Sequence, residues 1–290
     1  MNDAPDRTGL ALVALSAVTW ALAGVWVRQL PGVPLATVVA ARLALALVVL
    51  LPVVWLRRRA LAWPTHAAWG LAGVMVAYYT CAVAAFRLAP VAEATLFVNV
   101  SPLFAVAWAR LRREPLTRAQ RGGTALAFAG VMVILLPGAL NPTDADAARW
   151  AGDALALLAA LGMAVYAVLY QRLRPDAPAP LVVTTLTFTL GAVGLAGLVG
   201  VNGPAALDGL DAPAPWGALV GLAVVTTAVP TLAYSEAARR LPAVVTTTVR
   251  LLTPVVAAVA AWLVLGEAPS VWLAPGGALV LGGLALSVRG

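Results

Sequence analysis

Three ionisable side chains lie deep inside long apolar stretches: Arg42, Glu93 and Arg250. A charge surrounded by hydrocarbon costs ~2.5 kcal/mol or more, so each should face the interior of a helix bundle and find a partner there. Arg42 could bind a substrate carboxylate or pair with an acid such as Glu93. It could also brace backbone carbonyls at a break in a helix.

Glu93 and Arg250 each allow two interpretations. Glu93 could exchange protons or bind a substrate ammonium, or it could simply lie at the positive N-terminus of a helix that begins behind Pro90. Arg250 shares a helix face with Thr246 and Thr253. It could therefore face a site, or it could extend toward the membrane surface with its charge in the headgroups.

Three prolines inside apolar stretches predict helix kinks: Pro102, Pro230 and Pro254. Each proline lacks an N–H and frees the carbonyl four residues earlier. The freed carbonyls belong to Val98, Thr226 and Arg250. In lipid these carbonyls need partners or cavity water, so the kinks should mark the depth of a binding site.

Aromatic and polar residues gather at the same depth and could line a cavity for a small zwitterion with an apolar side chain. Burial would stabilise the apolar part, while hydroxyl, amide and freed carbonyl groups would meet its charged ends. Plain helix packing is the alternative for each position. The candidates are Trp20, Tyr78, Tyr79, Phe97, Asn99, Ser101, Met163, Tyr166, Thr227, Thr246 and Thr253.

The composition predicts that lipid is the solvent. Of the 290 residues, 62% are hydrophobic and 11% are charged, against about a quarter charged in soluble domains. The net charge of +7 could suggest nucleic acid, but the arginines cluster in short gaps between apolar stretches, as in membrane topology. One cysteine and one histidine exclude an intrachain disulfide and a multi-histidine metal site. We expect no cofactor, because no P-loop, G-x-S-x-G or H-E-x-x-H motif occurs.

Ten apolar windows are long enough to cross ~30 Å of hydrocarbon as helices. They lie at about 9–27, 35–56, 67–86, 91–109, 120–137, 150–170, 180–200, 215–235, 242–263 and 270–288. The window at 180–200 is the weakest, because it contains four threonines and several glycines. The first window resembles a cleaved signal peptide, but a similar segment recurs internally, which favours a membrane span.

Arginine placement predicts the orientation. With a cytoplasmic N-terminus, fourteen arginines fall in inner segments and three in outer segments, while Arg42 and Arg250 lie within spans. Arginine-rich loops stay in the cytoplasm, so both termini are predicted to be cytoplasmic in a multi-pass protein of the bacterial inner (plasma) membrane. Nine of the ten tryptophans lie at span ends or in a loop, as expected at the headgroup level. The exception, Trp20, should face the bundle interior because its indole N–H needs a partner.

An internal repeat relates residues 1–140 to 141–290. The stretch "LAPVAEATLFVNVSPLFAVAWARLRREPLT" is matched by "RLPAVVTTTVRLLTPVVAAVAAWLVLGEAPS", with two prolines twelve residues apart in each copy. Paired glycines follow the glutamates Glu114 and Glu267 by nine and sixteen residues. Those glycines are Gly123 and Gly130 in the first copy and Gly276 and Gly283 in the second. A weaker echo pairs 9–29 with 152–172. Because five spans is an odd number, the second copy must be inverted in the membrane.

The pattern "PLFA…EPLT" near 92–117, its second copy ending "GEAPS", and the arginine of "AARLALALVVLLP" resemble the EamA branch of the drug/metabolite transporter superfamily. Within it the chain is most similar to the YddG-like amino-acid exporters. The resemblance implies an arginine at the position of Arg42 across substrates of different kinds, and for this reason we favour the brace for that residue. The resemblance covers the whole chain and implies a cavity lined by the first, third, fourth, sixth, eighth and ninth spans, with the fifth and tenth peripheral. Met163 stands where the first copy has Trp20, so the cavity should be asymmetric.

We therefore expect an all-α integral membrane protein with ten transmembrane helices, arranged as two inverted five-helix repeats around a central cavity. The expected function is secondary transport that exports small metabolites, above all amino acids, by alternating access. The expected partners are a small-molecule substrate and the lipid bilayer, not nucleic acid; a monomer is compatible with the sequence. The alternatives are an exporter of lipophilic cations that uses Glu93, a channel, and a membrane-embedded enzyme that pairs Ser101 with His66.

Overall fold

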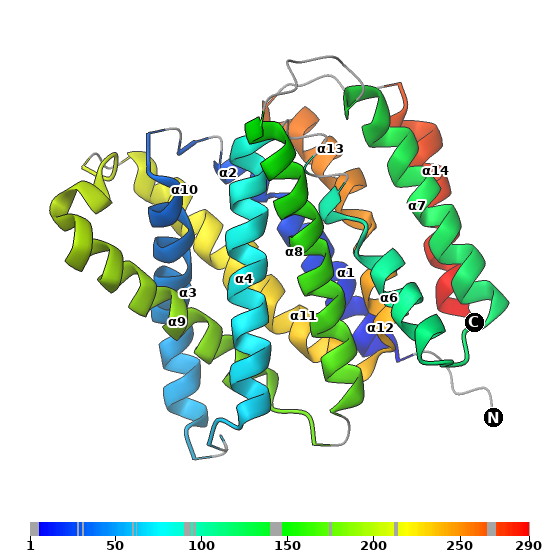
Figure 1. Cartoon of the computed structure of the whole chain (residues 1–290), viewed down its shortest axis with the longest axis horizontal. Coiled ribbons are helices and arrows are strands. Elements are labelled where there is room, and N and C mark those ends of the chain that lie inside the picture. Colours follow the sequence, from blue (N-terminus) through cyan, green and yellow to red (C-terminus); the bar gives the residue numbers. More distant parts are fainter. Residues whose placement is uncertain are drawn as a thin grey trace.

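The computed structural model of the chain describes residues 6–27, 29–30, 32–59, 61, 63–89, 94, 97–139, 147–173, 176–211, 214–265 and 271–289. Within these residues the chain is helical and contains no strand. Six helical segments are long and apolar enough to cross a membrane, and two shorter apolar helices, Arg7–Ala21 and Leu273–Ser287, join them. In Figure 1 many of the helices run close to the vertical direction of the view, and others cross it diagonally.

The first half begins with an interrupted helix and continues with long ones. Its elements are α1 (Arg7–Ala21), α2 (Ala23–Val27), α3 (Leu35–Arg57), α4 (His66–Leu88), α6 (Ser101–Leu111) and α7 (Arg118–Ala139). The span predicted at 91–109 is not one continuous helix in its described part. Residues 99–100 form a turn before α6, so Pro102 lies in the first turn of a new helix, where its missing N–H costs nothing.

The second half repeats this plan in reverse orientation. Its elements are α8 (Ala147–Arg172), α9 (Pro180–Asn202), the 3₁₀ helix η1 (Gly203–Leu207), α10 (Ala214–Ala223), the π-helical η2 (Val224–Ala228), α11 (Val229–Arg240), α12 (Ala243–Val249), α13 (Leu252–Leu265) and α14 (Leu273–Arg289). The weakest predicted window, 180–200, is a regular helix. The break between α12 and α13 corresponds to the turn before α6, and Pro254 is the third residue of α13.

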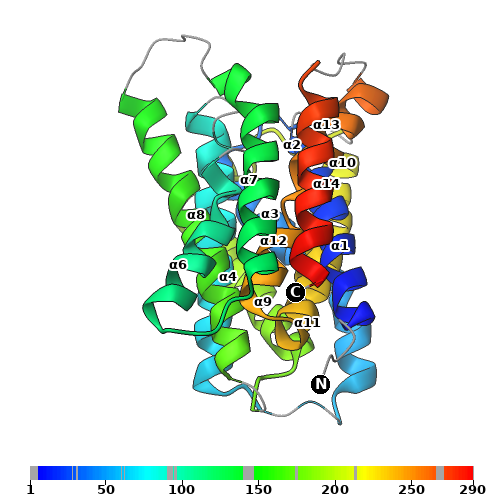
Figure 2. The ribbon, with the colours of Figure 1, turned by 90° about the vertical axis from the view of Figure 1, so that its right-hand side faces the viewer.

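Helix pairing follows the symmetry that an inverted repeat requires. The third span packs on the sixth (α4 on α8), and the eighth packs on the first (α11 on α1). Each contact joins the third span of one half to the first span of the other half, so the two contacts are equivalent. The second span packs on the seventh (α3 on α9) and the fifth on the tenth (α7 on α14). The partners run antiparallel in Figures 1 and 2. A two-fold axis between the halves gives this pattern.

In the outermost pair, α7 and α14, each of two glycines on one helix faces the backbone of a glycine on the other. A Cβ atom added to Gly123 would lie 2.6 Å from the carbonyl oxygen of Gly283, and one added to Gly283 would lie 2.5 Å from that of Gly123. Gly130 and Gly276 face one another in the same way, at 2.5 and 2.7 Å. The glycine spacing found in the two sequence copies thus lets the backbones of the two helices touch. Figure 1 shows this pair at the right-hand edge of the bundle, and Figure 2 shows it from the front.

Gly9 and Gly152, which begin the weaker sequence echo, also occupy equivalent places. A Cβ at Gly9 would lie 2.9 Å from the Cγ of Leu241, just after α11, and one at Gly152 would lie 2.7 Å from the backbone nitrogen of Ala89, just after α4. The start of each half therefore packs against the end of the third span of the other half.

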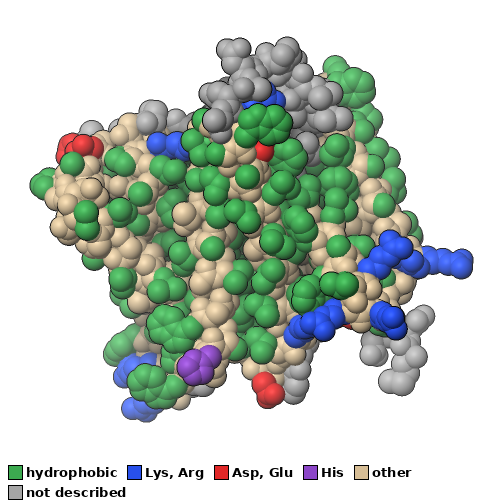
Figure 3. All heavy atoms as spheres, viewed as in Figure 1, with side chains coloured by type: hydrophobic (Ala, Val, Ile, Leu, Met, Phe, Trp, Pro, Cys, Tyr) green, Lys and Arg blue, Asp and Glu red, His purple; other side chains and the backbone are tan. Residues whose placement is uncertain are grey.

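The surface suits a bilayer. In Figure 3 hydrophobic atoms cover the middle of this face, and most of the blue side chains lie near its lower edge. Exposed tryptophans lie at helix ends, as predicted, including Trp63 (92% exposed), Trp150 and Trp262. Trp20 is buried, which confirms that it faces the interior.

Candidate functional site

Aromatic side chains from four spans meet in the middle of the bundle. The Trp20 ring lies 6.1 Å from that of Tyr78 and 5.3 Å from that of Tyr234, and Tyr166 lies 6.0 Å from Tyr234. All four side chains are buried. Three of the expected residues, Trp20, Tyr78 and Tyr166, thus lie together, and with Tyr234 they form a packed cluster of rings in this conformation.

A hydrogen-bonded chain connects these rings across the two halves. The indole Nε1 of Trp20 donates to the Tyr79 hydroxyl at 3.4 Å, and that hydroxyl lies 2.6 Å from Oγ1 of Thr231. A parallel contact of 2.5 Å joins the Tyr166 hydroxyl to Oγ of Ser235. The helix α11 therefore presents polar groups to tyrosines of both α4 and α8.

Arg42 braces the π-helical segment η2. Its Nη2 donates to the carbonyl oxygen of Thr226 at 3.0 Å and its Nε donates to Oγ1 of Thr227 at 2.8 Å. The Thr226 carbonyl is the one that Pro230 leaves without its helical partner. The guanidinium also lies over the Tyr79 ring, 4.7 Å from the centroid. This geometry is that of the brace we favoured from the sequence, and the side chain is only 4% exposed.

Arg250 has a different environment. It lies between α12 and α13, is 3% exposed, and donates from Nη2 to the Tyr78 hydroxyl at 3.2 Å. Its guanidinium carbon lies 5.0 Å from the Trp20 ring, 5.6 Å from that of Tyr78 and 5.9 Å from that of Tyr234. Nε and Nη1 have no hydrogen-bond partner. Of the two interpretations, extension to the membrane surface is wrong, because the aromatic rings hold the side chain in the centre.

The matched helix breaks lie beside this centre. In the first half the N–H of Val100 donates to the Phe97 carbonyl at 3.1 Å. In the second half the N–H of Leu251 donates to the Thr248 carbonyl at 2.9 Å, and that of Thr253 donates to the Arg250 carbonyl at 2.9 Å. Of these bonds, the one to Arg250 satisfies the carbonyl that Pro254 frees, and the other two close the turns at the helix breaks.

The other predicted residues occupy varied positions. Asn99, Ser101, Met163 and Thr246 are buried, and Phe97 is half-buried against the same core. The Thr246 hydroxyl donates to the carbonyl of Pro242 in its own helix at 3.0 Å. Thr253 is half-buried, and its hydroxyl has no partner. Glu93 and Glu267 lie outside the described residues.

Sequence reasoning missed four contributors on α8 and α11: Tyr170, Thr231, Tyr234 and Ser235. Tyr170 stacks edge-on against Tyr166 at 5.1 Å, and the Tyr234 hydroxyl is buried without a partner. Thr231 and Tyr234 follow Thr227 by four and seven residues, which places all three on one helix face. That spacing could have identified them. The enzyme alternative paired Ser101 with His66 as its base. His66 is exposed at the start of α4, whereas Ser101 is buried.

A pocket of about 230 Å³ opens at the end of α6, between α8 and α12, lined in part by Trp108, Glu114 and Gln171. The Glu114 carboxylate accepts from Nε2 of Gln171 at 3.4 Å and lies 3.9 Å from Nη2 of Arg172. Oε1 of Gln171 accepts the N–H of Ala243 at 2.7 Å. Gln171 thus links the end of the fourth span to the start of the ninth.

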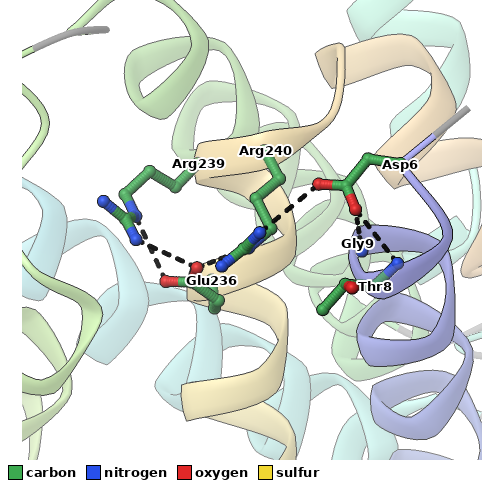
Figure 4. Close-up of polar contacts among 6 residues, drawn as sticks. All are labelled: Asp6, Thr8, Gly9, Glu236, Arg239 and Arg240. Carbon is green, nitrogen blue, oxygen red and sulfur yellow. Dashed lines mark hydrogen bonds and ion pairs between the residues drawn. The ribbon is translucent and has the colours of Figure 1, made fainter.

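Charged residues tie α1 to α11 on the side where the chain begins (Figure 4). Asp6 caps α1 by accepting the N–H groups of Thr8 and Gly9, and its carboxylate lies 3.6 Å from Nη1 of Arg240. Glu236 holds both Arg240 and Arg239. The backbone N–H of Gly9 and the charge of Arg240 help hold the pKa of Asp6 below its usual value.

Comparison with known proteins agrees with this architecture. A solved structure titled only "Crystal structure of protein" superposes with a TM-score of 0.81 at 22% identity, over 97% of this chain and 96% of that one, which shows the shared fold. Among curated proteins no relative matches the chain. A family model matches twice, at residues 7–136 and again at 150–289. The two matches cover nearly the whole sequence, and the chain therefore belongs to the EamA-like transporter family, whose members are membrane transporters of small molecules.

Proposed function

We propose that this chain is a secondary transporter of the YddG-like type that exports amino acids across the bacterial inner membrane. The observation that carries the proposal is the pair of matched helix breaks beside a buried aromatic centre, with Arg250 in one of them. Inverted halves that meet at such breaks can exchange conformations, which gives each side of the membrane access in turn.

The moving units would be residues 1–140 and 141–290. Contacts between the halves, such as α4 on α8 and α1 on α11, are the surfaces across which one half would rock on the other. The arginine-rich segments 57–59 and 110–113 support cytoplasmic termini. A closed centre, with rings packed together, corresponds to a state without cargo.

Amino acids suit the centre because it combines apolar rings with hydrogen-bonding groups. Tyr78, Tyr79 and Thr231 offer hydroxyls, while Trp20 and Tyr234 offer apolar faces. An apolar side chain gains free energy on burial among rings, and the charged ends of an amino acid need polar partners.

Reconstitution tests the proposal. Proteoliposomes loaded with amino acids, sugars or lipophilic cations should release labelled phenylalanine and leucine, and external unlabelled amino acid should accelerate that release. Acceleration by trans substrate distinguishes a carrier from a channel. Repeating the efflux with and without a pH gradient shows whether protons drive it. Release of lipophilic cations with no release of any amino acid would contradict the proposal.

A further inference from the structure

The guanidinium of Arg250 is the least satisfied polar group at the centre of the molecule. Two of its three nitrogens, Nε and Nη1, are buried with no hydrogen-bond partner, and the third donates only to the Tyr78 hydroxyl. Buried N–H groups are nearly always paired in proteins. An arginine kept in this state is therefore expected to meet an acceptor at some other stage of the working cycle.

The aromatic rings around the guanidinium stabilise its positive charge but do not satisfy the hydrogen bonds of its N–H groups. Trp20, Tyr78 and Tyr234 present ring centroids 5.0 to 5.9 Å from the guanidinium carbon, a distance at which the ring electrons attract a cation. Rings accept no strong hydrogen bond, so the N–H groups stay available. Tyr234, whose ring centroid lies 5.9 Å from the guanidinium carbon, also has a buried hydroxyl without a partner.

Arg42 shows what a structural arginine looks like in the same protein. It donates to a carbonyl and a hydroxyl of one helix segment and is fixed there. Among the described residues, no ion pair joins Arg42 or Arg250 to a carboxylate. Within the described part of the chain these two positive charges have no carboxylate partner, which favours a negative group on the cargo and disfavours a cation.

The position of Arg250 in the chain connects binding to movement. It follows α12 directly and precedes α13, at the break matched in the first half. An anion bound there would fix the angle between the two helices, because the guanidinium and the break share one residue.

From these contacts we infer that Arg250 is the recognition site for a carboxylate of the cargo, and that the cargo is a carboxylate joined to an apolar or aromatic group. A carboxylate is an acceptor-only group with two oxygens and is the small ligand best matched to a guanidinium. The apolar part of the cargo would insert between the rings of Trp20 and Tyr234, so that each ring packs against the cargo and no longer against the other ring. This inference rests on the proposed export function and specifies which end of an amino acid the site selects.

Competition against the wild-type protein tests the inference without any variant. In counterflow of labelled phenylalanine, 3-phenylpropionate retains the carboxylate and lacks the amine, whereas phenethylamine retains the amine and lacks the carboxylate. We expect 3-phenylpropionate to compete at least ten times more strongly. Equal competition by the two compounds, or stronger competition by phenethylamine, would overturn the assignment.

Two variants at the site and one outside it sharpen the test. Arg250→Gln should weaken phenylalanine affinity about 10- to 100-fold, since a hydrogen bond to a charged group is lost; Arg250→Lys should recover part of the loss, because it keeps the charge without the planar fork. Arg239→Gln, at an exposed arginine of α11, is the control and should transport normally. Wild-type affinity in Arg250→Gln would refute the inference.

Ligand-dependent thermal stability separates failure of this inference from failure of the export proposal. In detergent, 3-phenylpropionate should raise the Tm of the wild-type protein and of Arg239→Gln but not of Arg250→Gln, because a ligand stabilises the state that binds it. If no amino acid is exchanged in liposomes but this shift is present, the export proposal fails and the carboxylate site stands. If amino acids are exchanged and the shift is equal in all variants, the site is wrong and export stands.

Discussion

The carboxylate of Asp6 and the guanidinium of Arg240 lie 3.6 Å apart and join the first residue before α1 to the last residue of α11. The repeat places Arg149 and Leu88 at the equivalent positions of the other half, and that pair cannot form an ion pair. The Asp6–Arg240 connection therefore has no counterpart between these two equivalent positions, and it lies on the side predicted to be cytoplasmic.

Loss of this connection should open the α1–α11 contact on that side. We expect Arg240→Gln to speed amide hydrogen exchange in residues 8–13 and 236–241, because opening exposes backbone groups that the closed contact protects. Arg239→Gln is the matched control, since Arg239 contacts Glu236 and leaves the Asp6–Arg240 pair in place. Equal exchange in the two variants would show that the pair does not restrain the contact.

The same carboxylate gives the closed contact a pH dependence with a defined sign. The pKa of Asp6 lies below its usual value of 3.8 in the folded protein, so its ionised form stabilises the fold above that value and the contribution is lost as the pH falls through the lowered pKa. Asp6→Asn should have a lower Tm than the wild type at pH 6 to 7. The difference should shrink as the pH falls below about 4, and a difference that grows there would contradict this account.

The glycine pairs between α7 and α14 predict a sharp contrast between neighbouring positions. Gly123→Ala places a methyl group 2.6 Å from the Gly283 carbonyl, whereas a Cβ at Gly122 meets only Cδ2 of Leu286, at 3.7 Å. Overpacking costs about 1–3 kcal/mol, so Gly123→Ala should lower the Tm by several degrees. Gly122→Ala should leave it unchanged or raise it slightly, because alanine favours helix by up to ~1 kcal/mol. Thermal unfolding of both variants in one detergent decides the matter.

Sequence patterns predicted those structural features that depend on a single physical property of the chain. Apolar length located the spans, and the spacing of Gly123 and Gly130 against Gly276 and Gly283 indicated the repeat. That these glycines face one another between α7 and α14 was not predicted. The direction of side chains could not be obtained in this way. Whether Arg250 points to the membrane surface or to the centre depends on Trp20 and Tyr234, which belong to spans far away in the chain.

Helix irregularities were only partly foreseeable. Pro230 predicted a freed carbonyl at Thr226, and that carbonyl is the one that accepts from Arg42. The π-helical turn of η2, where the Val229 N–H reaches the Val224 carbonyl, depends on how α10 and η2 pack against α3. No local preference of the sequence specifies such a turn, because one extra residue per turn is favourable only with tertiary partners.

The brace formed by Arg42 leads to the last prediction, which separates structural from substrate-binding arginines. Arg42→Leu removes both donors and leaves the Thr226 carbonyl buried, at a cost of about 1–3 kcal/mol, so the Tm should fall. Thr227→Val removes only the acceptor of Nε and should cost less. Because the two residues share one interaction, their double variant should be less destabilised than the sum of the single changes.

Affinity provides the contrasting measurement for Arg42. If Arg42 acts only through the π-helical segment, the surviving folded fraction of Arg42→Leu should bind 3-phenylpropionate as the wild type does, with a normal ligand-induced rise in Tm. Unchanged stability together with lost binding would instead make Arg42 a ligand for the substrate. Since both arginines are buried to the same degree, burial alone cannot distinguish them, and the distinction rests on which N–H groups already have acceptors.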